Sequence, residues 1–130
     1  MNFLSWPLIQ AGRIFTNRKN KNMGYIKHHA IVITSWDEKL IRKARRKAKQ
    51  IFGKQVSGIV PSVINAYDSF FIGPDGSKEG RDDSHSGDAN REKFIAWVKK
   101  QAYSDGSNSL SFAELFYGED EGKAEILDHN

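Results

Sequence analysis

The sequence predicts a single α+β domain, in which an antiparallel sheet packs against two helices on one of its faces. Four stretches are rich in β-branched or aromatic residues and read as strands. Two further stretches carry apolar residues at helical spacing and separate the first strand from the second and the third from the fourth. With 130 residues the chain has room for about one such domain.

The first strand and the first helix are the clearest elements. Residues 25–35, "YIKHHAIVITS", predict a strand. Ser35 and Glu38 match the Ser-x-x-Glu capping box, so we expect Ser35 to cap the helix that follows. Gly53 stands where a helix commonly ends in a left-handed residue.

The remaining elements complete a βαββαβ order. Residues 56–67 predict a short or broken strand, which Pro61 restricts to an edge or a bulge. A third strand from residue 68 runs into a Pro-Asp-Gly-Ser turn, and the polar loop 81–88 precedes a helix expected from about Asp88 to Tyr103, before a last strand over 110–118. This order is typical of a ferredoxin-like plait.

The two ends of the chain differ from this domain, which we place at residues 23–119. Residues 1–22 contain no acidic side chain, include Pro7 and end in a polar Asn/Lys/Arg stretch. We expect them to be a flexible arm, or the product of a mis-assigned start with translation beginning at Met23. Residues 120–130 are expected to form an acidic tail.

Both faces of the central strands are apolar. In the first strand Ala30 and Val32 alternate with Ile31 and Ile33, so each face receives aliphatic side chains. The helices can cover only one face. We therefore expect a partner copy, the N-terminal arm or a ligand to cover the other, and we favour a homodimer.

The first helix combines an apolar stripe with a strongly basic remainder. Leu40, Ile41, Ala44, Ala48, Ile51 and Phe52 share one arc and predict a core helix whatever the function. Residues 37–54 hold eight basic and two acidic side chains, whereas 55–130 hold seven basic and fourteen acidic ones. The basic face is thus either a solvated surface neutralised by the acidic half or a phosphate-binding surface, for which the candidate residues are Arg42, Arg45, Arg46 and Lys49.

A second group of candidate ligand contacts comprises His28, Arg81, Ser84 and His85. The last three lie in "RDDSHSGD", where Ser86 or Asp88 could equally serve as a helix cap. His28 and His29 are neighbours on a strand and point to opposite faces, so they cannot easily share one ion. We therefore expect no metal site.

Several functional classes lack their signatures. The chain has no cysteine, which removes disulfides and thiolate chemistry. No apolar run approaches the roughly 18 residues of a membrane span. Phosphate-loop, GxSxG and HExxH motifs are missing as well, so we expect a soluble, cytoplasmic, non-enzymatic protein without a cofactor.

The biological context of the protein is indicated by two segments, "MGYIKHHAIVITSWDE" and "SFFIGPDGSKEG…SGDANREKFIAWVKKQAYSDGSNSL". From residue 23 to about 119 the chain resembles small accessory proteins encoded by tailed bacteriophages. The resemblance carries no activity and no catalytic residue. It implies a phage-encoded protein that acts in the bacterial host cytoplasm and binds something there, as counter-defence proteins do when they sequester nucleotide signals.

Three functions are therefore compatible with the sequence. The leading hypothesis is a binding protein for an anionic, nucleotide-like small ligand that interferes with host functions. The alternatives are a nucleic-acid-binding regulator that uses the basic helix 37–52, and a protein-interaction inhibitor with an acidic surface over 114–128.

Overall fold

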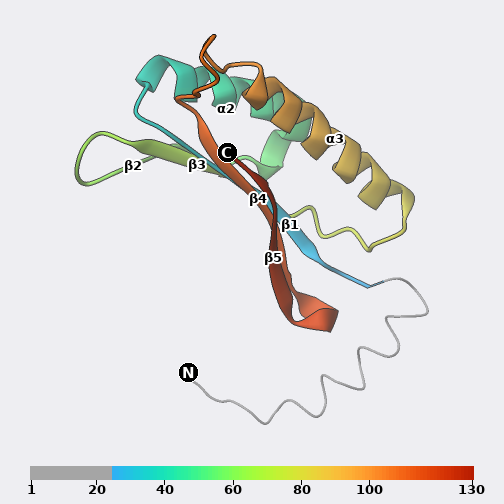
Figure 1. Ribbon diagram of the computed structural model, residues 1–130. Helices are drawn as coiled ribbons and strands as arrows, with labels where there is room; N and C mark the ends of the chain where they lie inside the picture. The colour runs from blue at the N-terminus through green and yellow to red at the C-terminus, as the bar shows by residue number, and fades with distance from the viewer. Residues whose placement is uncertain (1–24) are drawn as a thin grey trace.

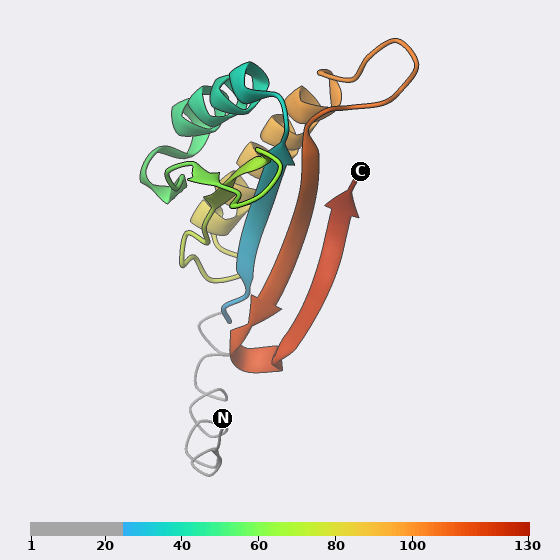
Figure 2. The same ribbon diagram turned by 90° about the vertical axis from the view of Figure 1, so that its left-hand side faces the viewer.

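The computed structural model describes residues 25–130, apart from the side chain of Glu121. The expectations about an arm at 1–22 and a start at Met23 lie outside the described residues. Five strands form one antiparallel sheet in the order β2-β3-β1-β4-β5, and both helices lie on the same side of it (Figures 1 and 2). The elements are β1 (His28–Ser35), α2 (Glu38–Phe52), β2 (Val60–Pro61), β3 (Asp68–Ile72), α3 (Asp82–Lys99), β4 (Ser111–Gly118) and β5 (Lys123–His129).

The expected α+β plait is confirmed. The first four strands follow the βαββαβ order with β1 between β3 and β4, and β2 forms one edge of the sheet. Pro61 lies in that two-residue edge strand, where a missing N–H donor costs no hydrogen bond within the sheet.

The core lies between the sheet and the two helices. Ile31 and Ile33 of β1 point into it, as expected from their alternation with Val32. The buried apolar residues that form this core are Ile31, Ile33, Ile41, Ala44, Ala48, Phe52, Val56, Phe70, Ile72, Phe94, Ile95, Val98, Leu110 and Phe112. The predicted apolar stripe of α2 is therefore the stripe that packs against the sheet.

The cap of α2 differs from the expected one. Asp37, not Ser35, is the N-cap residue, because its carboxylate Oδ1 accepts a hydrogen bond from the N–H of Leu40 at 3.1 Å. The Ser35 hydroxyl instead accepts from the Asp37 N–H at 3.0 Å. At the other end Gly53 does follow the helix with a positive φ of 61°, but its ψ of −120° lies outside the left-handed helical region that we expected.

The second helix begins earlier than expected, at Asp82, and ends earlier, at Lys99. The polar stretch 82–88 therefore forms its first two turns, and neither Ser86 nor Asp88 is a cap. Two acidic residues, Asp82 and Asp83, occupy the first turn, where negative charge interacts favourably with the helix dipole. Residues 82–88 were expected to form a loop because they are polar, but their acidic residues stabilise the start of a helix.

The segment 120–130, expected as an acidic tail, contains a fifth strand. β5 pairs with β4 along its length, with Leu115 opposite Ile126 and Glu114 opposite Asp128. An irregularity in register between Glu114 and Leu115 leaves Leu127 as the extra residue. β5 extends the sheet beyond the two helices (Figure 2). No helix in residues 25–130 is long and apolar enough to cross a membrane.

Candidate functional site

The basic surface of α2 results from its amphipathic sequence. Ile41, Ala44, Ala48 and Phe52 are buried, which turns the charged side chains outward. Two of the four predicted phosphate contacts have partners within the chain. An Arg42 Nη donates to the Glu38 carboxylate at 2.8 Å, and the Arg45 Nε donates to the Ser57 carbonyl at 2.8 Å.

The other basic side chains of α2 have no carboxylate within 4.0 Å among the described residues; these are Lys39, Lys43, Arg46, Lys47 and Lys49. The acidic half of the chain forms its ion pairs elsewhere. Asp128 pairs with Lys99 at 2.9 Å, and Glu114 lies 3.9 Å from Arg91. The described acidic residues after position 54 therefore do not neutralise the basic face of α2 by direct ion pairs.

A groove between α2 and α3 extends this basic surface. Its volume is about 260 Å³, and it is lined by Lys47 of α2, by Lys93, Ala96 and Trp97 of α3, and by Lys100 immediately after α3. The Trp97 ring stacks on that of Phe94, with centroids 6.1 Å apart and planes at 16°. Phe94 in turn contacts Phe52 edge to face, which anchors the tryptophan to the core.

The α3 residues of this groove were missed by the sequence analysis. Lys93, Ala96, Trp97 and Lys100 have the spacing i, i+3, i+4, i+7, which places them on one stripe of a helix. That spacing was a usable signal. What it could not show is that the stripe lies beside α2.

The second predicted group lies apart from α2. Ser84 is buried in the first turns of α3, where its hydroxyl donates to the Glu79 carboxylate at 3.5 Å, and His85 on the next position is exposed. Arg81 immediately precedes α3. The start of α3 lies at the end of that helix away from α2 (Figure 1). His28 is on the sheet and bonds Glu119 at 3.1 Å, so the fold does not gather this group with the arginines of α2.

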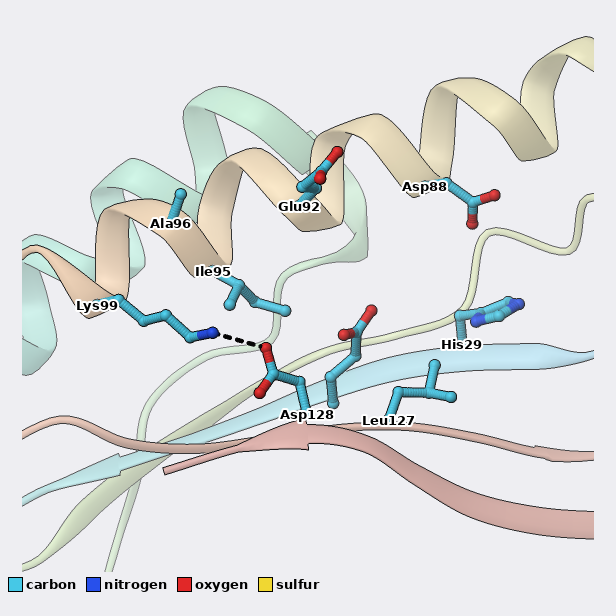
Figure 3. Close-up of a pocket in the computed structure, with 9 residues that line it drawn as sticks. His29, Asp88, Glu92, Ile95, Ala96, Lys99, Leu127 and Asp128 are labelled. Carbon is cyan, nitrogen blue, oxygen red and sulfur yellow. Dashed lines mark hydrogen bonds and ion pairs between the residues drawn. The ribbon is translucent and has the colours of Figure 1, made fainter.

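A second hollow is acidic. This acidic cleft, of about 550 Å³, lies between α3 and the sheet where β5 extends past the helix (Figure 3). Its charged lining residues are Asp88, Glu92, Lys99, Glu114 and Asp128, and His29, Ile95, Ala96 and Leu127 complete it. The register irregularity in β5 turns both Leu127 and Asp128 toward the helix (Figure 3).

Burial and ion pairs perturb the carboxyl groups of the acidic cleft in opposite directions. Desolvation raises the pKa of Glu114, although the nearby Arg91 guanidinium opposes the shift. The hydrogen bond from Lys99 holds the pKa of Asp128 below its ordinary value. The cleft therefore contains one carboxyl that resists ionisation and one that is held ionised.

His29 lines the acidic cleft, and the buried Arg91 lies next to two of its lining residues, Asp88 and Glu114. Arg91 is 5% exposed and donates to Asp88 while lying beside Glu114. His29 Nε2 lies 3.1 Å from a Glu79 carboxylate oxygen. No group of three or more His, Asp or Glu side chains in residues 25–130 is arranged to hold a metal ion.

No family model, no curated protein and no solved structure matches the chain.

Proposed function

We propose that the protein is a non-enzymatic binding protein for an anionic, nucleotide-like ligand, which docks on the basic surface of its helix layer. The observation that carries the proposal is the groove in which Lys47, Lys93 and Lys100 surround Trp97. Ammonium groups bind phosphate as point charges, and an indole ring offers a stacking surface to a base. A nucleotide presents both features within one small molecule.

A nucleic-acid-binding regulator is the second candidate, and the extent of the basic surface favours it. The basic side chains of α2 that have no carboxylate partner within residues 25–130 run from Lys39 to Lys49, along a helix of 15 residues that is roughly 22 Å long. A single nucleotide would contact only a part of that length. A strand of nucleic acid could contact several of these residues at once, with an affinity that falls steeply as salt rises.

The setting that we propose is the bacterial host cytoplasm, where a phage-encoded protein of this kind interferes with host functions in the manner of a counter-defence protein. We also propose that it acts as a homodimer. The third candidate, an acidic surface that inhibits a protein partner, would use the acidic cleft and the neighbouring strands β4 and β5 instead of the helix layer.

Thermal unfolding of the full chain against nucleotides and oligonucleotides separates these candidates. A ligand that binds only the folded state at one hundred times its Kd stabilises the protein by about 2.7 kcal/mol. We expect one class of nucleotide to raise the Tm with little dependence on polymer length. A nucleic-acid regulator would instead bind oligonucleotides with a strong salt dependence. Absence of binding to either class would contradict both and favour the acidic surface.

Two double variants test the position of the site. Lys93→Gln with Lys100→Gln removes two charges from the groove, and Lys78→Gln with Lys123→Gln removes two charges elsewhere, so both variants have the same net charge. We expect the first to weaken nucleotide binding at least tenfold and the second to leave it nearly unchanged. Equal weakening by both would show that only the overall charge matters, and the groove would be rejected as the site.

A further inference from the structure

The sheet face opposite the helices is not covered by any residue of 25–130 that belongs to a helix (Figure 2). Cross-strand partners share a face, so the register identifies its members from Val32, which lies opposite Phe71 and Ala113. We call this surface the open face. Its strand positions are His28, Ala30, Val32, Thr34, Val60, Ser69, Phe71, Ser111, Ala113, Leu115, Tyr117, Ala124, Ile126 and His129.

None of these strand positions carries Lys, Arg, Asp or Glu, although such residues make up 28% of the chain. The strands do contain five of them, and every one points to the helix side; they are Asp68, Glu114, Lys123, Glu125 and Asp128. An antiparallel sheet with one solvated face normally has the reverse pattern, with charged residues turned toward water. The charge distribution of the strands is thus that of a sheet covered on the open face.

We infer that a second copy of this chain covers the open face, with the two sheets packed face to face about a two-fold axis. Such an interface brings the same patch against itself, so any charged residue on it would meet its own like charge near the axis. The open face limits this cost because no strand position on it carries Lys, Arg, Asp or Glu, and the Glu119 carboxylate lies against it only at His28, the first residue of β1. A dimer through the helix layer would instead bring the lysines of α2, which have no carboxylate partner in the described part of the chain, against one another.

The area and shape of the open face are compatible with a dimer interface of small size. Four strands spaced about 4.8 Å apart, each about seven residues long at roughly 3.3 Å per residue, cover on the order of 450 Å² of flat area. Two copies would bury on the order of 1,000 Å², which is near the lower limit of specific interfaces. The centre carries small side chains around a shallow hollow of about 230 Å³ lined by Val32, Thr34, Ser111 and Ala113, into which Val32 or Phe71 of the other copy can pack.

This arrangement would leave both helix layers on the outside of the dimer. It gives the interface of the homodimer proposed above, and it does not depend on the ligand that the protein binds. If that function is correct, the two grooves face away from each other, and a long polyanion could contact both copies while a nucleotide would bind each copy separately.

Sedimentation equilibrium of the full chain between about 1 and 200 μM, together with three lysine substitutions, tests the inference. Val32→Lys and Ile126→Lys introduce charge on the open face at side chains that are 39% and 58% exposed. Val63→Lys makes the same kind of change at a fully exposed valine in the loop between β2 and β3, which is not one of the strand positions of the open face. We expect the parent chain and Val63→Lys to dimerise alike, and both open-face variants to weaken dimerisation at least tenfold.

Circular dichroism checks that each variant is folded, and Ile126→Lys decides the matter if Val32→Lys fails to fold, because Ile126 lies at the more exposed position. A parent chain that stays monomeric at 200 μM overturns the inference. Equal dimerisation by the parent chain and the open-face variants would likewise reject this interface.

Discussion

The buried arginine beside the acidic cleft offers the sharpest test of how this fold is stabilised. Arg91→Met removes a guanidinium that is 5% exposed and leaves Glu114, which is 17% exposed, without its nearest cation. Breaking a buried pair in this way typically costs about 3–5 kcal/mol. The other pairing residue, Asp88, is 59% exposed and can be solvated by water once Arg91 is gone. We therefore expect the lower end, about 3 kcal/mol, or a fall in Tm of roughly 11–14 °C.

The loss should depend on pH, and its sign follows from Glu114. Burial already holds the pKa of Glu114 above its ordinary 4.5, and Arg91 lowers it, so the variant should raise that pKa further. A carboxyl with a raised pKa in the folded state destabilises the fold only when pH is high enough to ionise it in the unfolded chain. The destabilisation should therefore be largest at neutral pH and shrink below about pH 4.5.

Urea unfolding at pH 4 and pH 7 measures both quantities. Adding Glu114→Gln to the Arg91→Met variant should recover about 1 kcal/mol or more at pH 7, because the uncompensated carboxylate is then removed. Arg42→Met is the matched control, since it breaks an exposed ion pair with Glu38 and should cost under about 1 kcal/mol. A loss below about 1 kcal/mol for Arg91→Met, or an equal loss at both pH values, would refute this account.

Two further predictions concern backbone positions, and urea unfolding tests both. Gly87 lies inside α3, where Gly→Ala would ordinarily stabilise by about 1 kcal/mol, but a Cβ there would lie 2.8 Å from Asp75 Oδ2 and 3.1 Å from an Arg91 Nη. We therefore expect Gly87→Ala to bring little or no gain, because both side chains must shift, and a gain of about 1 kcal/mol or more would contradict the packing argument. Ala66→Gly should stabilise by up to about 1 kcal/mol, since Ala66 has φ of 54°, which disfavours a side chain; a clear loss of stability would show that the turn is not strained.

The sequence was sufficient to predict the plait because its strong elements are locally encoded. The alternation in 30–33 and the apolar stripe of 40–52 each repeat with the period of one type of element, and the structure confirms both. The errors fell where composition opposed the structure. Polar residues open α3, and acidic residues fill the stretch before β5, so both segments resemble loops until tertiary packing is known.

The sequence predicted only part of the candidate site. The basic face of α2 follows from a single helical wheel, and its outward orientation is what the fold shows. The ion pair of Arg42 with Glu38 has the i, i+4 spacing that the same helical wheel could have shown. The hydrogen bond from Arg45 to the Ser57 carbonyl joins residues 12 positions apart and could not be predicted from it. The pairing of Lys47 with the Trp97 stripe of α3 depends on how two helices pack, which local periodicity does not report.

By itself the sequence determined which side chains each helix and strand turns to either side, because that depends only on the periods of 3.6 and 2.0 residues. The tertiary structure decided which of those surfaces meet. It paired α2 with α3 around Trp97, and it added β5 beyond the helices to form the acidic cleft. It also left an uncharged sheet face without a helix over it. The groove, the acidic cleft and the open face all result from contacts between residues distant along the chain, which no local sequence pattern encodes.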